Sequence, residues 1–232
     1  MLKLIGEMFT YPFMVRALCM GVLVALCSAV LGVTLVLKRY SMIGDGLSHV
    51  GFGALAAGVM VVSMTTGMNT DVYNYLFGSI LSMSREDVAL TGVVSAVIMV
   101  LFVLFYNRIF AVTFDETFAR ATGMNAELYN MVIALLTALV IVIGMRMMGS
   151  LLISSLVVFP AVTSMRTCIT FRSVMICSAV VSAVCLVAGL VISYLYAAPT
   201  GASIVLCNIA AFILFAAVRK GRECLQSDRK SL

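Results

Sequence analysis

The chain has 232 residues, of which 63% are hydrophobic and only 11% are charged. With a mean hydropathy of +1.16, it differs sharply from soluble domains, which have about 45–50% apolar and ~25% charged residues. This composition excludes a soluble globular protein and predicts an integral membrane protein.

About seven mainly apolar runs are long enough to cross a hydrocarbon core of ~30 Å as helices. They are residues 17–37, 42–64, 88–106, 128–145, 148–165, 173–196 and 203–218. Because the runs are continuous rather than alternating, they favour helices over a β-barrel. We predict one domain, 1–232, folded as an all-α polytopic transmembrane bundle of the plasma or inner membrane. Lys3, Glu7 and Arg16 precede the first run, so we expect a retained span rather than a signal peptide.

The lysine and arginine residues predict the orientation of the bundle. With the C-terminus inside, the inner segments hold Lys38, Arg39, Arg108, Arg120, Arg166, Arg172, Arg219, Lys220, Arg222, Arg229 and Lys230. The outer segments then hold Lys3, Arg16, Arg85 and Arg146. This asymmetry favours an N-outside, C-inside topology. The net charge of +5 is therefore a topology signal, with no indication of nucleic-acid binding.

Asp45 and His49 are ionisable residues inside the second apolar run. Such residues are costly in a membrane and often mark an ion or proton pathway. Their i, i+4 spacing places a carboxylate and an imidazole on one helix face, where both can meet a divalent cation. The alternative is structural: Asp45 caps a helix and His49 makes an interhelical hydrogen bond.

Two connections are longer than turns. The outer connection, 65–87, has aromatic residues suited to an interfacial or re-entrant segment. The inner connection, 107–127, predicts a short cytoplasmic helix that ends at Gly123. Asp115 and Glu116 lie near the start of that helix, and Asp115, Ala119 and Gly123 predict a small-residue strip for close packing of a partner. A connector helix with no special role is the alternative.

The remaining features favour structural interpretations. The seven cysteines form no C-x-x-C pair, and the 17 methionines form no M-x-x-M repeats, so we interpret both as packing residues. Small residues in the first span predict helix contacts. Pro160 predicts a bend, either static or a hinge, and Arg146 predicts snorkelling to headgroups or attraction of an acidic protein.

Five ordered landmarks carry a family resemblance. They are Gly44-Asp45-Gly46-Leu47-Ser48-His49, Tyr75-Leu76-Phe77-Gly78, the Asp115/Ala119/Gly123 pattern, Met148–Leu152 leading to Phe159-Pro160-Ala161, and Pro199-Thr200-Gly201-Ala202. Together they resemble the permease subunit of the zinc/manganese/iron family of ATP-binding-cassette importers, the ABC-3 type. The resemblance covers nearly the whole chain. It departs from the family after residue 58, where about two spans of ~20 residues and their connections are absent.

The resemblance implies a permease that works as a homodimer with a cytoplasmic ATP-binding subunit and an extracytoplasmic metal-binding protein. It places Asp45 and His49 along the metal pathway, and Asp115, Glu116, Ala119 and Gly123 in the coupling helix that contacts the ATPase. The cargo is then a transported divalent metal, zinc in the first place, because the residues after His49 look closer to zinc-type members. Manganese and iron are the alternatives, and no permanently bound cofactor is expected.

Two other classes of function stay open. A secondary ion transporter or channel would use Asp45 and His49 as a relay and would need no ATPase. A scaffold or non-functional remnant would explain the missing pair of helices. The chain lacks the phosphate-binding pattern G-x-x-x-x-G-K-[ST] and the zincin motif H-E-x-x-H, so we expect no enzyme activity of its own.

Overall fold

The computed structural model describes residues 11–38, 84–196 and 198–230. Within these ranges the chain is helical and contains no strand. The helices are α2 (Pro12–Leu37), α5 (Arg85–Leu104), α6 (Tyr106–Phe114), α7 (Glu116–Ala121), α8 (Ala126–Met148), α9 (Ser150–Met165), α10 (Phe171–Tyr196) and α11 (Thr200–Lys230). The all-α membrane bundle predicted from the sequence is confirmed.

Five of the described helices, α2, α5, α8, α10 and α11, are long and apolar enough to cross a membrane. They coincide with five of the predicted runs. The predicted span 148–165 corresponds to α9, a shorter apolar helix of 16 residues. The predicted span 42–64 and most of the outer connection 65–87 lie outside the described residues.

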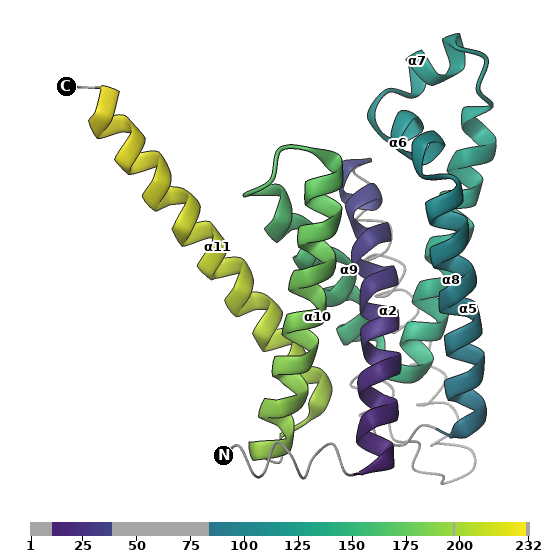
Figure 1. Ribbon diagram of the computed structural model, residues 1–232, viewed down its shortest axis with the longest axis vertical. Coiled ribbons are helices and arrows are strands. Elements are labelled where there is room, and N and C mark those ends of the chain that lie inside the picture. The colour runs from purple at the N-terminus through teal and green to yellow at the C-terminus, as the bar shows by residue number, and fades with distance from the viewer. Residues whose placement is uncertain (1–10, 39–83, 197, 231–232) are drawn as a thin grey trace, which may run out of the picture.

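Helix α2 lies at the centre of the described bundle, in contact with α5, α6, α8, α9 and α10 (Figure 1). Its small residues explain this position, since Ala25, Ser28 and Ala29 are fully buried. A Cβ added to Gly32 would lie only 2.0 Å from the carbonyl oxygen of Val157 in α9. Only glycine therefore allows this approach of the two backbones, and the predicted role of the small residues in helix contacts is confirmed.

Two serines of α10 hold this helix to α2 by hydrogen bonds. The Ser178 hydroxyl donates to the carbonyl oxygen of Ala29 at 3.2 Å, and that of Ser182 donates to the carbonyl oxygen of Ala25 at 3.1 Å. Both serines are fully buried. Because small side chains face each other here, the serine hydroxyls reach backbone carbonyl oxygens that also accept hydrogen bonds within α2.

The outer helices expose apolar side chains. In the most hydrophobic segment of α2, 67% of the residues are buried, against 22% in the corresponding segments of α5 and α11. Val100 and Val103 of α5 and Ile213 and Leu214 of α11 are each at least 60% exposed. Figure 1 shows α11 slanting away from the other helices. Such faces suit contact with lipid, as expected of a protein in a membrane.

Most basic residues of the described helices belong to one end of the bundle. This is the end that carries α7 (Figure 1). At this end Lys38 follows α2, Arg166 follows α9 and Arg172 is the second residue of α10. Arg108 of α6 and Arg120 of α7 lie at the same end. Arg16, Arg85 and Arg146 lie at the opposite end. The described part of the chain thus has the charge asymmetry on which the predicted orientation depends; the orientation itself stays a prediction.

Arg146 forms an ion pair, which neither sequence interpretation anticipated. Its Nη2 lies 3.1 Å from Oδ1 of Asp87 in the first turn of α5. The other oxygen of Asp87 accepts from the Ser84 hydroxyl at 2.7 Å, within a capping box that begins α5. One carboxylate therefore both caps α5 and joins it to the end of α8.

Pro160 and the cysteines have the surroundings expected of packing residues. Pro160 is buried inside α9, and the Ser164 hydroxyl donates to its carbonyl oxygen. A bend at Pro160 stays a prediction. The described cysteines are free thiols, and Cys27 and Cys185 are buried.

Candidate functional site

The connection between α5 and α8 folds as two short helices, α6 and α7, where the sequence predicted one. Asp115 separates them, because its backbone is extended (φ −145°, ψ 94°) and its side chain caps α7. Its Oδ1 accepts a hydrogen bond from the backbone N–H of Phe118 at 2.8 Å. Asp115 thus satisfies one of the free donors at the start of α7, as an N-cap residue does.

Gly123 ends α7 as the sequence predicted. Its φ of +81° lies in the left-handed region, which glycine adopts without steric cost. The N–H of Gly123 donates to the carbonyl of Arg120 and the N–H of Met124 to that of Ala119, both at 3.0 Å. These two bonds form a Schellman motif. With caps at both ends, α7 is a well-defined helix despite its length of six residues.

The predicted small-residue strip is not a surface of the structure. Ala119 is fully buried and packs in a cluster with Val112 and Ala126, which closes α7 onto α6 and α8. Gly123 lies beyond the end of the helix, in an exposed turn. The strip is not free for a partner because Ala119 faces α6 and α8, whereas Ala121, the other alanine of α7, is exposed. A role for Asp115, Glu116, Ala119 and Gly123 in coupling to a partner stays a prediction.

Glu116 joins α7 to two other helices. Its Oε2 accepts a hydrogen bond from Nδ2 of Asn130 in α8 at 3.2 Å and lies 4.0 Å from Nζ of Lys38. Its Oε1 lies 2.8 Å from Nη2 of Arg120, one turn along α7. The Lys38 ammonium also donates to the Asn130 side chain. The connection is thereby tied to the ends of both α2 and α8.

These contacts shift the pKa values of Glu116 and Lys38. The hydrogen bond from Asn130, together with Arg120 and Lys38, lowers the pKa of Glu116 below its ordinary value of 4.5. Burial lowers the pKa of Lys38, partly opposed by the charge of Glu116. The Lys38 side chain is only 6% exposed, so its ammonium needs the oxygens around it.

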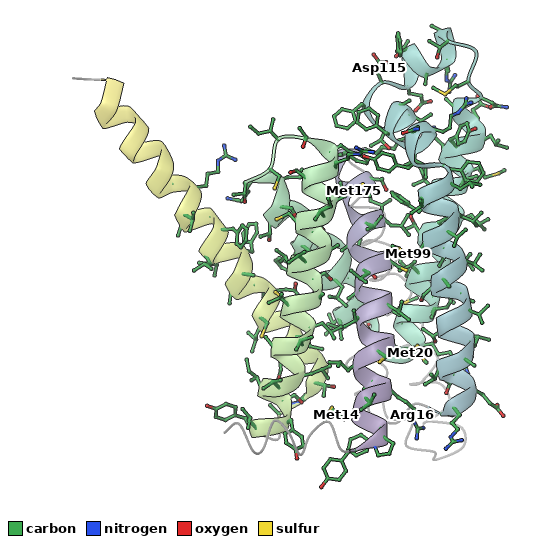
Figure 2. The ribbon with its side chains drawn as sticks, in the orientation of Figure 1. Met14, Arg16, Met20, Met99, Asp115 and Met175 are labelled. Atoms are coloured by element: carbon green, nitrogen blue, oxygen red, sulfur yellow. The ribbon has the colours of Figure 1, made fainter. Side chains whose placement is uncertain are left out.

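The outward surface of the connection is aromatic. Phe118 is 63% exposed, Phe114 58% and Phe110 41%. The rings of Phe110, Phe114 and Phe171 contact one another. Figure 2 shows that Asp115 lies at the extreme end of the bundle, beyond the long helices. Sequence reasoning missed Phe114, Phe118, Lys38 and Asn130. The four-residue spacing of Phe110 and Phe114 was the available signal for the aromatic surface of α6. Phe118 lies in α7, beyond the break at Asp115, where this spacing does not apply.

The predicted pathway residues Asp45 and His49 lie outside the described residues. Among the residues that the structure does describe, no group of three or more His, Cys, Asp or Glu side chains is placed to hold a metal ion. The pathway hypothesis is therefore based on the sequence.

The family model described as "ABC 3 transport family" matches residues 10–58 and 50–219. The chain belongs to the ABC 3 transport family. Among its curated relatives within this family of metal transporter permeases, "High-affinity zinc uptake system membrane protein ZnuB" from Haemophilus influenzae is 24% identical over 88% of this chain and 97% of its own length. "Manganese transport system membrane protein MntC" from Halalkalibacterium halodurans is 24% identical over 90% and 88%. "Probable iron transport system membrane protein" from Haemophilus influenzae is 26% identical over 92% and 93%.

This ABC 3 chain also shares its fold with a solved structure. That structure is "PsaBC from Streptococcus pneumoniae in complex with Fab", with a TM-score of 0.78 and 24% identity over 92% of this chain and 94% of the matched chain. The match covers nearly all of both chains, so the bundle is the membrane-permease fold that the sequence resemblance implied.

The alignments also locate the shortening of this ABC 3 chain. The match to ZnuB spans 252 positions, although 88% of 232 residues is about 204, so about 48 positions have no residue of this chain opposite them. The match to the iron relative spans 263 positions, against about 213 for 92% of the chain. The two parts of the family match meet at residues 50–58. A segment of this length accommodates two spans, in agreement with the departure seen in the sequence.

Proposed function

We propose that this protein is the transmembrane permease subunit of an ATP-driven importer of a divalent metal ion, with zinc as the first candidate. The observation that carries the proposal is the family match across residues 10–219, together with relatives named for zinc, manganese and iron transport. Manganese and iron are the alternatives for the metal. ATP hydrolysis belongs to a separate subunit, because the sequence contains no phosphate-binding loop of its own.

Asp45 and His49 are proposed to meet the metal on its way through the membrane. A transport site must bind an ion weakly enough to release it, so few ligands are an advantage and a closed four-ligand site would retain it. His49 is the only histidine of the chain. Two copies related by symmetry would offer two carboxylates and two imidazoles along a shared path. A homodimer is therefore part of the proposal.

The connection that contains α7 is proposed to bind the ATP-binding subunit. Three features support this assignment: α7 is capped at both ends, Phe118 projects from it, and Glu116 fixes it to α2 and α8. An exposed aromatic side chain on a rigid helix is a common anchor in protein interfaces. Ala119 then supports the helix from within and makes no contact with the partner.

Metal uptake tests the proposal. The chain is expressed with its neighbouring ATPase and binding protein in a strain that lacks its own importers, and accumulation of zinc, manganese and iron is measured. We expect uptake to require ATPase activity and to be lost in His49→Ala. Full uptake by a His49→Ala variant that inserts normally would reject the pathway role. Uptake without the ATPase would favour a secondary transporter, and no uptake of any metal would favour a non-functional remnant.

Co-purification with the ATPase tests the α7 assignment separately. Phe118→Ala is expected to weaken co-purification, since it removes the exposed ring at the contact. Phe13→Ala is the matched control, because Phe13 is also exposed but lies near the start of α2, at the opposite end of the bundle. Equal co-purification of the two variants would contradict the assignment.

A further inference from the structure

A pocket opens at the α7 end of the bundle, between α5/α6 and the start of α10. Its volume is about 520 Å³, and its lining consists of Val103, Tyr106, Asn107, Arg172, Met175 and Ile176. Figure 2 shows Met175 near the start of α10, at the same end of the bundle as the last turn of α2. Sites for small molecules typically measure ~300–1,000 Å³, so this pocket can hold a headgroup and the adjoining part of an acyl chain.

The wall of the pocket is apolar and faces outward. Val103 of α5 and Ile176 of α10 are both 67% exposed, and neither is covered by another described helix. On a membrane protein, exposed aliphatic side chains of this kind lie against lipid tails. The pocket is therefore open toward the membrane along its apolar side.

The rim of the pocket is cationic. The Arg172 guanidinium lies 5.9 Å from the ring centroid of Tyr106, and Arg172 and Asn107 are both exposed. No described carboxylate forms an ion pair with Arg172; those of Glu116 and Glu127, at this end, lie against Lys38 and Arg120. The donors of Arg172 are thus available to an anion, and arginine matches the geometry of a phosphate.

The pocket lies at the expected level of the lipid headgroups. The span α5 ends at Leu104, next to Val103, and the span α10 begins at Phe171, next to Arg172. Both spans end within one residue of the pocket lining, so its apolar wall belongs to the membrane core and Arg172 to the boundary. Basic pockets between membrane helices at this level suit anionic lipid headgroups.

We propose that this pocket binds one anionic phospholipid, with the phosphate on Arg172 and an acyl chain along Val103 and Ile176. The assignment depends on the membrane location of the protein and not on the identity of the transported metal. The bound lipid would fill the space between the ends of α5 and α10, which flank α2 at this end without packing against each other extensively.

Native mass spectrometry of the purified full-length chain tests the proposal. The protein is titrated with phosphatidylglycerol or with phosphatidylcholine of the same acyl chains. We expect one phosphatidylglycerol per chain to be retained in preference to phosphatidylcholine. Arg172→Ala should lower the affinity for phosphatidylglycerol about fivefold, as expected for one basic residue at an anionic membrane surface. Arg172→Lys should retain most of it.

Arg108→Ala is the matched control, because Arg108 is an exposed arginine of α6 at the same end that does not line the pocket. Ile176→Trp should also reduce binding, since the indole fills the apolar side while Arg172 remains. Equal retention of the two lipids, or an equal effect of Arg172→Ala and Arg108→Ala, would overturn the proposal. Displacement of the lipid by an equal concentration of glycerol 3-phosphate would also overturn it, in favour of a soluble anion.

Discussion

Gly32→Ala should be among the most damaging single-methyl changes in the described bundle. At this position the backbones of α2 and α9 are so close that an added Cβ would lie 2.0 Å from the carbonyl oxygen of Val157 and 2.9 Å from its carbonyl carbon. Ordinary contact begins near 3.4 Å, so the two helices would have to separate by about 1.4 Å. The obstacle is backbone and not a flexible side chain, so no rotamer change can relieve it.

The expected cost is about 1–3 kcal/mol, the usual range for overpacking a close helix contact. For a chain of this size the melting temperature should fall by between about 2 and 12 °C. The sequence contains no tryptophan, but Cys27 and Cys185 are buried, so a thiol-reactive fluorescent dye in detergent can report unfolding.

Gly92→Ala in α5 is the matched control for Gly32→Ala. Its Cβ would lie 3.6 Å from Met20 Cε, which is ordinary contact with a flexible side chain. It should be neutral, or stabilising by up to ~1 kcal/mol through helix propensity. A Gly32→Ala protein that melts at the same temperature as Gly92→Ala would refute the close approach of α2 and α9.

Three further predictions concern the polar contacts. Ser178→Ala and Ser182→Ala should each lower stability by about 0.6 kcal/mol, the usual value of a hydrogen bond between membrane helices, and exposed Ser173→Ala should have no effect in the same melts. Arg146→Ala should lower the melting temperature only slightly, because the arginine side chain is 70% exposed. Asp87→Ala also removes the cap of α5 and should lower the melting temperature clearly more. Equal losses in the two variants would contradict the double role of Asp87. Because the folded-state pKa of Glu116 is lowered, the stability that Glu116 contributes is present above pH ~4.5 and is lost as the pH falls through its folded-state pKa. Glu116→Gln should therefore weaken the loss of stability at acid pH in melts between about pH 3.5 and 7. An unchanged pH dependence in this variant would contradict the stabilising role of the Glu116 carboxylate.

The long helices could be predicted from the sequence because they depend on one property, the length of an apolar run. An apolar run of sufficient length has few alternatives in a membrane, where every backbone polar group must be satisfied within a helix or barrel. The runs 17–37, 88–106 and 173–196 therefore correspond directly to α2, α5 and α10. The small residues of α2 were also assigned to helix contacts, since a close approach requires them wherever the partner helix lies.

The details of the connection could not be predicted in the same way. The end of α7 at Gly123 follows from local backbone chemistry, and the positive φ of Gly123 confirms it. The burial of Ala119 depends on Val112 and Ala126, which approach it only after α6 and α8 have packed. The link between Glu116 and Lys38 joins residues 78 positions apart, and the pairing of Asp87 with Arg146 spans 59. No periodicity in the sequence carries such tertiary contacts.

Glu116 gives the proposed permease a physical link between α7 and the ends of two membrane helices, α2 and α8. The Glu116 carboxylate of α7 contacts Asn130 on α8 and Lys38 at the end of α2, so a displacement of α7 would act on both helices. Lys38 precedes Asp45 by only seven residues in the sequence, so the end of α2 connects this network to the proposed pathway segment. Of the two partners of Glu116 on other helices, Lys38 is the one that lies close to Asp45 and His49 in the sequence. If α7 transmits the ATPase motion, Lys38→Met should reduce metal uptake while leaving ATPase binding intact, because the contact surface around Phe118 is unchanged.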